Sequence, residues 1–297
     1  MILRARERRL DLGRPLLMGI VNASPDSFSD ARAETREATV ERGRALLADG
    51  ADILDVGGES ARGDRPAVPA DEEISRVCGV ISALPDAVVS VDTYKAEVAE
   101  AAIAAGASIV NDVSGLRDPR LAEVCARTGA ALVIMHTRVA PKGTLLDPSA
   151  YDDVVADVVG FLGERIEVAL DAGVTREQLI LDPGPDFAKT PAQTVAVLRR
   201  LDALRAFGRP ILLAASRKDF VGAVTGRAAP DRDAGTLAAI GYGVDAGASI
   251  VRVHDVAGAH DYLAVRAVLR GERVLGPLEG LSPDRYPDGV PPHLSLG

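Results

Sequence analysis

Eight short apolar runs recur along the chain and limit its fold more than any other feature. In chain order they read LLMGIVN, ADILDVGG, VVSVDT, SIVNDVSG, ALVIMHT, LILDPG, ILLAASRK and SIVRVHDV. Continuous apolar runs without polar alternation are typical of strands in a parallel sheet that is covered on both faces. Segments rich in helix formers lie between them, such as REATVERGRALLADG and EVAEAAIAAG. The chain therefore alternates strand and helix.

The junctions between helices and strands repeat a Gly-Ala pair. It occurs at Gly50-Ala51, Gly106-Ala107, Gly129-Ala130 and Gly247-Ala248. A glycine there supplies the left-handed residue that ends a helix. Eight β/α units in 297 residues predict a single α/β domain, a (β/α)8 TIM barrel. An open doubly wound sheet is the alternative, but eight parallel strands are near its upper size.

Two ends of the chain lie outside this pattern. We predict a barrel domain over residues 1–270 and an irregular extension over 271–297, because the tail is rich in proline and glycine and lacks periodicity. The arginine-rich start is interpreted as a strand or a surface cap. Its arginines are Arg4, Arg6, Arg8 and Arg9.

Charge and cysteine content exclude several classes of protein. The net charge of −9 argues against nucleic acid as a partner. No stretch reaches about 18 uninterrupted apolar residues and the start lacks an apolar signal segment, so we expect neither membrane insertion nor export. Cys78 and Cys125 are isolated in helix-like segments. They indicate a reduced, cytoplasmic protein without a disulfide framework.

Polar side chains follow nearly every predicted strand. They are Asn22, Asp55, Glu59, Asp92, Asn111, Asp112, His136, Asp182, Ser216, Arg217, Lys218, Arg252, His254 and Asp255. Each one alone is compatible with a helix cap or a turn. In a barrel, however, all these strand ends meet on the face that carries the active site. Together they predict one functional site.

The residue types at these ends indicate a ligand. Asp92, Asn111 and Asp182 can pair with a donor-rich heterocycle, whereas Arg252 and His254 suit an anion. Lys218 suits either group. With 3% aromatic residues and no tryptophan, a ring would stack on Arg252, Met135 or a loop phenylalanine. We predict a site for a flat polar ring that bears phosphate.

Nine motifs match a known family in order and position. They are NASPDSFSD, DVGGESAR, SVDTYK, NDVSG, MH, LDPG, FAKT, SRKDFVG and RVHDV. On these motifs the chain resembles the dihydropteroate synthase family, from about Leu16 to about Val268. The resemblance implies a TIM barrel that condenses 6-hydroxymethyl-7,8-dihydropterin pyrophosphate with p-aminobenzoate, forming 7,8-dihydropteroate and pyrophosphate for folate synthesis. It also implies a homodimer.

The resemblance implies a role for each matching residue. Asp92, Asn111, Met135, Asp182 and Lys218 would hold the pterin, with Arg252 stacked on its ring. Arg252 and His254 would bind the pyrophosphate together with Mg²⁺, for which Asn22 is the protein ligand. This fits the preference of Mg²⁺ for few protein oxygens plus phosphate oxygens and water.

The remaining implied residues surround the p-aminobenzoate. They are Phe28, Ser29, Arg62, Phe187 and Ser216. The loop NASPDSFSD would act as a lid, in which Asp30 stabilises positive charge on the pterin after pyrophosphate leaves. Asp30, Lys218, Arg252 and His254 are the implied catalytic residues, and no covalent nucleophile is needed.

Four departures from the family pattern leave alternatives open. Ala61 replaces a threonine, Asp186 replaces a glycine before Phe187, the loop after His136 reads TRVAPKGTLL, and Ala23-Ser24 stands in the first loop. A carboxylate at position 186 could crowd the pterin. One alternative is a pterin-binding relative without this activity or with another acceptor. Another is a methyltransferase acting on methyltetrahydrofolate, although SRK and RVH suit a pyrophosphate leaving group.

Overall fold

Eight parallel strands form one sheet in the order β8-β7-β6-β5-β4-β3-β10-β9. The computed structural model describes residues 1–23, 35–60 and 66–276. The strands of this sheet are β3 (Leu16–Asn22), β4 (Ile53–Gly57), β5 (Val89–Asp92), β6 (Ile109–Asp112), β7 (Ala131–Met135), β8 (Leu179–Asp182), β9 (Leu212–Leu213) and β10 (Ile250–Val253). Each one coincides with a predicted apolar run.

The two outer strands of this order meet and close the sheet. Leu181 of β8 forms a parallel bridge with Ile211, directly before β9. The Leu181 N–H also donates to Pro210 O over 2.9 Å. The predicted barrel is therefore confirmed, and the open-sheet alternative is wrong.

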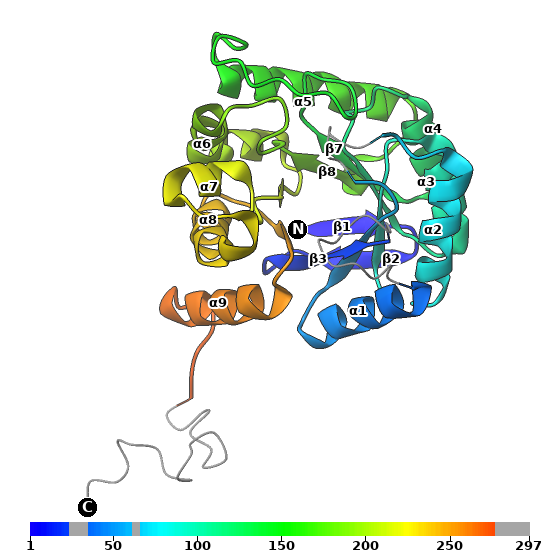
Figure 1. Cartoon of the computed structure of the whole chain (residues 1–297), viewed down its shortest axis with the longest axis horizontal. Coiled ribbons are helices and arrows are strands. Elements are labelled where there is room, and N and C mark those ends of the chain that lie inside the picture. Colours follow the sequence, from blue (N-terminus) through cyan, green and yellow to red (C-terminus); the bar gives the residue numbers. More distant parts are fainter. Residues whose placement is uncertain (24–34, 61–65, 277–297) are drawn as a thin grey trace, which may run out of the picture. The chain divides into compact units, whose positions relative to one another are not determined.

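Helices cover the outside of the sheet (Figure 1). They are α1 (Arg36–Ala48), α2 (Ala70–Ser82), α3 (Ala96–Ala105), α4 (Arg120–Thr128), α5 (Val154–Asp171), α6 (Pro191–Arg199), α7 (Asp219–Thr225) and α8 (Asp233–Asp245), with short 3₁₀ helices η1 (Arg176–Gln178), η2 (Leu201–Phe207) and η3 (Ala229–Asp231). A further helix, α9 (Val256–Leu269), follows β10 in the chain. The repeated Gly-Ala junctions are confirmed, since all four of their glycines have positive φ.

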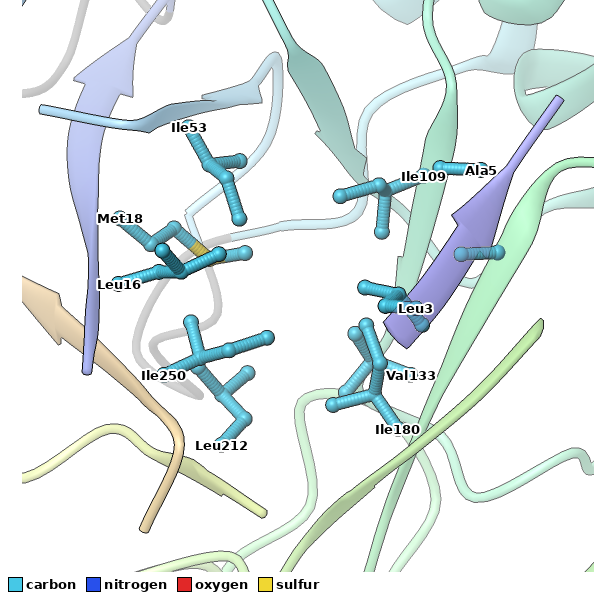
Figure 2. Packing of buried hydrophobic residues seen from close by; sticks show 11 residues of the cluster. Leu3, Ala5, Leu16, Met18, Ile53, Ile109, Val133, Ile180, Leu212 and Ile250 are labelled. Carbon is cyan, nitrogen blue, oxygen red and sulfur yellow. The ribbon is translucent and has the colours of Figure 1, made fainter. Parts of the chain in front are cut away.

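A hairpin before the barrel fills the end that lies opposite the predicted site. It pairs β1 (Ile2–Ala5) with β2 (Arg8–Asp11). Leu3 and Ala5 are fully buried in an apolar cluster with the first residues of several barrel strands. Figure 2 shows these side chains converging with Leu16, Ile109 and Ile250. Because the hairpin covers the amino ends of the strands, we expect a ligand at the carboxyl ends.

The chain forms two units by its internal contacts, Met1–His260 and Asp261–Gly297. The first contains the whole barrel. The second begins with the last part of α9 and contains an ion pair between Arg266 and Glu272. The domain boundary at residue 270 stays a prediction, and most of the predicted tail lies outside the described residues. Within the described part of the chain, no helix has the length and apolar character needed to span a membrane.

Candidate active site

Arg252 of β10 is the centre of a hydrogen-bonded cluster that joins four strands. Its Nε donates to Asp55 Oδ2 of β4 over 2.6 Å, and its Nη2 donates to Asp92 Oδ2 of β5 over 2.8 Å. Asn111 of β6 donates through Nδ2 to the same Asp55 oxygen over 3.1 Å. Parallel pairing places Asp92 beside Asn111 in the β5–β6 ladder. The fold thus brings together polar side chains that are far apart in the sequence.

Burial changes the protonation of this cluster. It raises the pKa of Asp92 to about 7, with Arg252 opposing the rise and Asp55 adding to it. Burial also raises the pKa of Asp182, at the end of β8, to about 6, against the Gly184 N–H that donates to its Oδ1 over 2.7 Å. For Arg252 burial favours the neutral form, but Asp55 and Asp92 outweigh it, so its pKa is raised. Arg252 therefore stays positively charged, and the acids Asp55, Asp92 and Asp182 act on it.

Two oxygens of this cluster lack a hydrogen-bond donor among the described residues. Asp55 Oδ1 and Asn111 Oδ1 are buried, and nothing in the described part of the chain donates to them. Buried acceptors without a donor are rare in folded proteins. A ring that carries N–H and amino groups can supply the missing donors. The chemistry of the cluster therefore fits a donor-rich heterocycle.

Ser216 and His254 form a second pair beside Arg252. Ser216 Oγ lies 2.9 Å from His254 Nδ1 and accepts a hydrogen bond from the His254 backbone N–H over 3.2 Å. Burial, reinforced by Arg252 and Arg217, lowers the pKa of His254 to about 4. The ring is neutral at pH 7 and carries one proton, on Nδ1 or on Nε2. In the Nε2 tautomer Ser216 Oγ–H donates to Nδ1, and Nε2–H is a neutral donor.

Lys218 lies between the β8–α6 turn and α7, where it is the N-cap residue. Its Nζ is 4.3 Å from the centre of the Phe187 ring. Burial lowers the pKa of Lys218, and Asp186 opposes this most strongly. The Asp186 carboxylate accepts hydrogen bonds from Thr194 Oγ1 and from the Asp219 backbone N–H. Asp186 is thus held by α6 and α7.

Two further predicted residues lie at strand ends. Met135 is buried at the end of β7. Asn22 is exposed at the end of β3. Phe28, Ser29, Asp30 and Arg62 lie outside the described residues. No group of three or more His, Cys, Asp or Glu that could hold a metal occurs within residues 1–23, 35–60 and 66–276.

The sequence assigned no role to two residues around the site. Asp55 was noted only as a polar strand end, yet it is fully buried and binds both Arg252 and Asn111. Lys189 is also buried and lies 2.7 Å from His136 Nδ1. For Asp55 a signal existed, since a carboxylate inside an apolar run needs a partner. Lys189 lies in the matched motif FAKT, but nothing in the sequence marks it as buried.

A protein-family model matches most of the barrel. The model of the family described as pterin binding enzyme matches residues 18–254. The dihydropteroate synthase of Bacillus subtilis (strain 168) is 42% identical over 248 residues, which cover 82% of this chain and 84% of that protein.

Solved structures give the same result. The dihydropteroate synthase of Xanthomonas albilineans with 4-aminobenzoic acid has a TM-score of 0.85 and 43% identity, covering 91% of this chain and 99% of that one. The same enzyme in complex with 7,8-dihydropteroate has a TM-score of 0.82 and 42% identity, with coverage of 91% and 99%. The chain therefore belongs to the pterin-binding enzyme family, among its dihydropteroate synthases.

Proposed function

We propose that the strand-end cluster around Arg252 is where this chain condenses 6-hydroxymethyl-7,8-dihydropterin pyrophosphate with p-aminobenzoate. The observation that carries the proposal is the pair of buried acceptors, Asp55 Oδ1 and Asn111 Oδ1, beside the acids Asp92 and Asp182. A dihydropterin presents an amino group and ring N–H groups along one edge. Its donors match these oxygens, and the guanidinium plane of Arg252 can lie against its face.

The leaving group is the second part of the substrate. Arg252 uses Nε and Nη2 for carboxylates, and its Nη1 donates to nothing within the described residues. Nη1, and the Nε2–H of His254 in its Nε2 tautomer, are free to donate to phosphate oxygens. Such donors stabilise pyrophosphate as its charge develops, and this favours early departure of the leaving group and a cationic pterin methylene.

The described residues offer one protein ligand for a magnesium ion, Asn22. Asn22 offers one exposed amide oxygen, and Mg²⁺ is commonly held by few protein oxygens together with substrate phosphates and water. Asn22 would hold it, and bound Mg²⁺ would neutralise charge on the pyrophosphate. Arg252 and His254 would orient the same phosphate oxygens.

We place p-aminobenzoate, the amine acceptor, at the rim of the site near Lys218. Phe187, stacked against the Lys218 ammonium, and Ser216 support a place for p-aminobenzoate at this rim. From the family resemblance we include Phe28, Ser29 and Arg62 in the same pocket, and Asp30 as the group that stabilises the cationic pterin. The same resemblance supports a homodimer, and the two free cysteines support a cytoplasmic location.

Product formation tests this proposal. The purified protein is supplied with dihydropterin pyrophosphate, p-aminobenzoate and Mg²⁺, and dihydropteroate and pyrophosphate are measured by chromatography. We expect product from the wild type and a loss of about 100-fold or more in kcat/KM for Arg252→Ala and Lys218→Ala. Arg14→Ala is the matched control, because Arg14 pairs with Asp52 at the opposite end of the barrel. Absence of product from the wild type would overturn the proposal.

A further inference from the structure

Lys189 is a fully enclosed ammonium group that the proposed chemistry does not use. Its side chain is among the largest fully buried ones in the described structure. Nζ lies 2.7 Å from His136 Nδ1 and donates to Gly184 O and Phe187 O, each over 3.0 Å. Burial lowers the pKa of Lys189 to about 7. Its hydrogen bonds thus go to the turn between β8 and α6.

His136 fixes the position of Lys189. Burial lowers the pKa of His136 to about 4, so its ring is neutral. His136 Nε2 lies 2.9 Å from Asp157 Oδ1 of α5, and a carboxylate can only accept, so the single ring proton is on Nε2. Nδ1 is then an acceptor for Lys189. The chain Asp157–His136–Lys189 connects α5 through β7 to the turn.

The backbone of this turn is strained and closely packed. Asp186 and Ala188 have φ of 65° and 51°, in the left-handed region that non-glycine residues rarely adopt. A Cβ added at Gly184 would lie 2.1 Å from His136 O. Such a backbone persists only where surrounding contacts determine it. Lys189, which binds a carbonyl on each side of Asp186, supplies those contacts.

Phe187 is the side chain that this turn presents to the site. Its carbonyl accepts from Lys189, and its ring faces Lys218 Nζ at 4.3 Å. We propose that Lys189 is a positioning residue that holds Phe187 against Lys218 and thereby sets the affinity for the aromatic amine. This inference rests on the proposed function, in which Phe187 borders p-aminobenzoate. Lys189 itself touches neither substrate.

Lys189→Met tests the role directly, since methionine keeps the length and apolar stem but donates no hydrogen bond. We expect KM for p-aminobenzoate to rise about tenfold while KM for dihydropterin pyrophosphate changes by less than about threefold. A general loss of structure would move both constants together. The wild type is assayed first, and if it forms no product the proposed function fails independently of this inference.

Two matched substitutions at His136 test the contacts of its two ring nitrogens one at a time. In His136→Asn the amide oxygen lies near the position of Nδ1 and still accepts from Lys189. In His136→Gln the amide reaches the position of Nε2 and keeps the contact with Asp157 only. We expect the glutamine variant to reproduce the KM increase of Lys189→Met and the asparagine variant to stay near the wild type. If Lys189→Met does not fold, the comparison of the two His136 variants tests the inference in its place.

A double-mutant cycle with Phe187→Leu completes the test. If Lys189 acts through Phe187, Lys189→Met should add little to the KM for p-aminobenzoate once the ring is gone. Additive effects of the two substitutions would overturn the inference. So would a folded Lys189→Met protein with an unchanged KM for p-aminobenzoate.

Discussion

The carboxylate of Asp186 accepts a hydrogen bond from the backbone N–H of Asp219, thirty-three residues further along the chain. Asp219 is the first residue of α7, directly after Lys218. The bond therefore connects the turn that carries Phe187 with the segment that carries Lys218. The sequence suggested that Asp186 could crowd the pterin, but the structure shows its carboxylate bound to Thr194 and to α7.

Asp186→Asn should change the pH dependence of catalysis. The asparagine amide oxygen can still accept from the Asp219 N–H, and its NH2 group can donate to Thr194 Oγ1, but the side chain lacks the charge that opposes the lowering of the Lys218 pKa by burial. The charges of Arg252, Asp182 and Asp219 also affect the Lys218 pKa, and this substitution leaves them in place. We expect the alkaline limb of the kcat/KM profile to move to lower pH. Asp219→Asn removes an exposed carboxylate nearby and should give a smaller shift. An unchanged limb in the Asp186 variant would contradict this electrostatic role.

Asp55→Asn should damage catalysis, because Asp55 holds Arg252, which we propose binds the leaving group. The substitution removes the charge that holds Arg252 Nε at 2.6 Å and leaves Asp92 as the carboxylate that pairs with the buried guanidinium. We expect kcat/KM to fall by about 10- to 100-fold, equivalent to about 1.4–2.8 kcal/mol. Steady-state kinetics measure this. Asp52→Asn, which breaks the Arg14 pair at the other barrel end, should stay within about twofold.

Asp92→Asn should alter how stability depends on pH. The pKa of Asp92 is about 7 in the folded protein, above its ordinary value of 3.8. The folded state therefore binds this proton more tightly, and the associated stability is present at low pH and decreases as pH rises toward 7. The asparagine variant lacks this decrease. Its melting temperature relative to the wild type should therefore rise between pH 5 and pH 8. The rise should be about 2 °C for each kcal/mol of unfolding free energy that the wild type loses over this pH range.

Calorimetry without substrates at both pH values checks this prediction. Asp233→Asn provides a contrast, because the hydrogen bonds and charge of Arg217 lower the pKa of Asp233. Its stabilising effect is complete at both pH values, so the melting temperature difference should be constant. A constant difference for Asp92→Asn as well would show that Asp92 is ionised in the folded protein.

Gly184→Ala and Gly208→Ala separate crowding from backbone strain. Both glycines have nearly the same φ, 64° and 61°, but an added Cβ meets His136 O at 2.1 Å in one case and nothing within 4 Å in the other. We expect Gly208→Ala to lower the free energy of unfolding by about 1–2 kcal/mol through strain alone. Gly184→Ala should cost about 2 kcal/mol more, because the backbone must move. Urea denaturation measures both, and equal losses would contradict a tightly packed turn.

The sequence predicted the barrel because its strands carry the signal locally. Each apolar run lies at a strand, and Gly50 and Gly247 adopt the positive φ expected at helix ends. The run ILLAASRK was less accurate, since only Leu212–Leu213 forms β9, Ile211 before it forms a single bridge, and the residues after Leu213 are not strand. The arginine-rich start was interpreted as a strand or a cap. It is a hairpin whose Leu3 and Ala5 enter the core, an effect of tertiary packing.

The candidate site was predictable only in part. The meeting of Arg252, Asp92 and Asn111 was predictable, because polar residues at strand ends come together in a barrel. Lys189 was not, because a lysine in a loop motif is normally solvent-exposed. Its burial depends on carbonyls from His136, directly after β7, and from the β8–α6 turn, which only the folded chain brings together. The roles of Phe28, Ser29, Asp30 and Arg62 stay predictions.

A crystal structure of this chain with bound 7,8-dihydropteroate would test the account most directly. We expect the pterin edge to donate to Asp55 Oδ1 and Asp182, its ring to lie against Arg252, and the benzoate ring to contact Phe187. Arg252→Ala crystals under the same conditions should show the pterin position empty or weakly occupied. A product bound away from the carboxyl ends of the strands, without contact to Arg252, would contradict the proposed site.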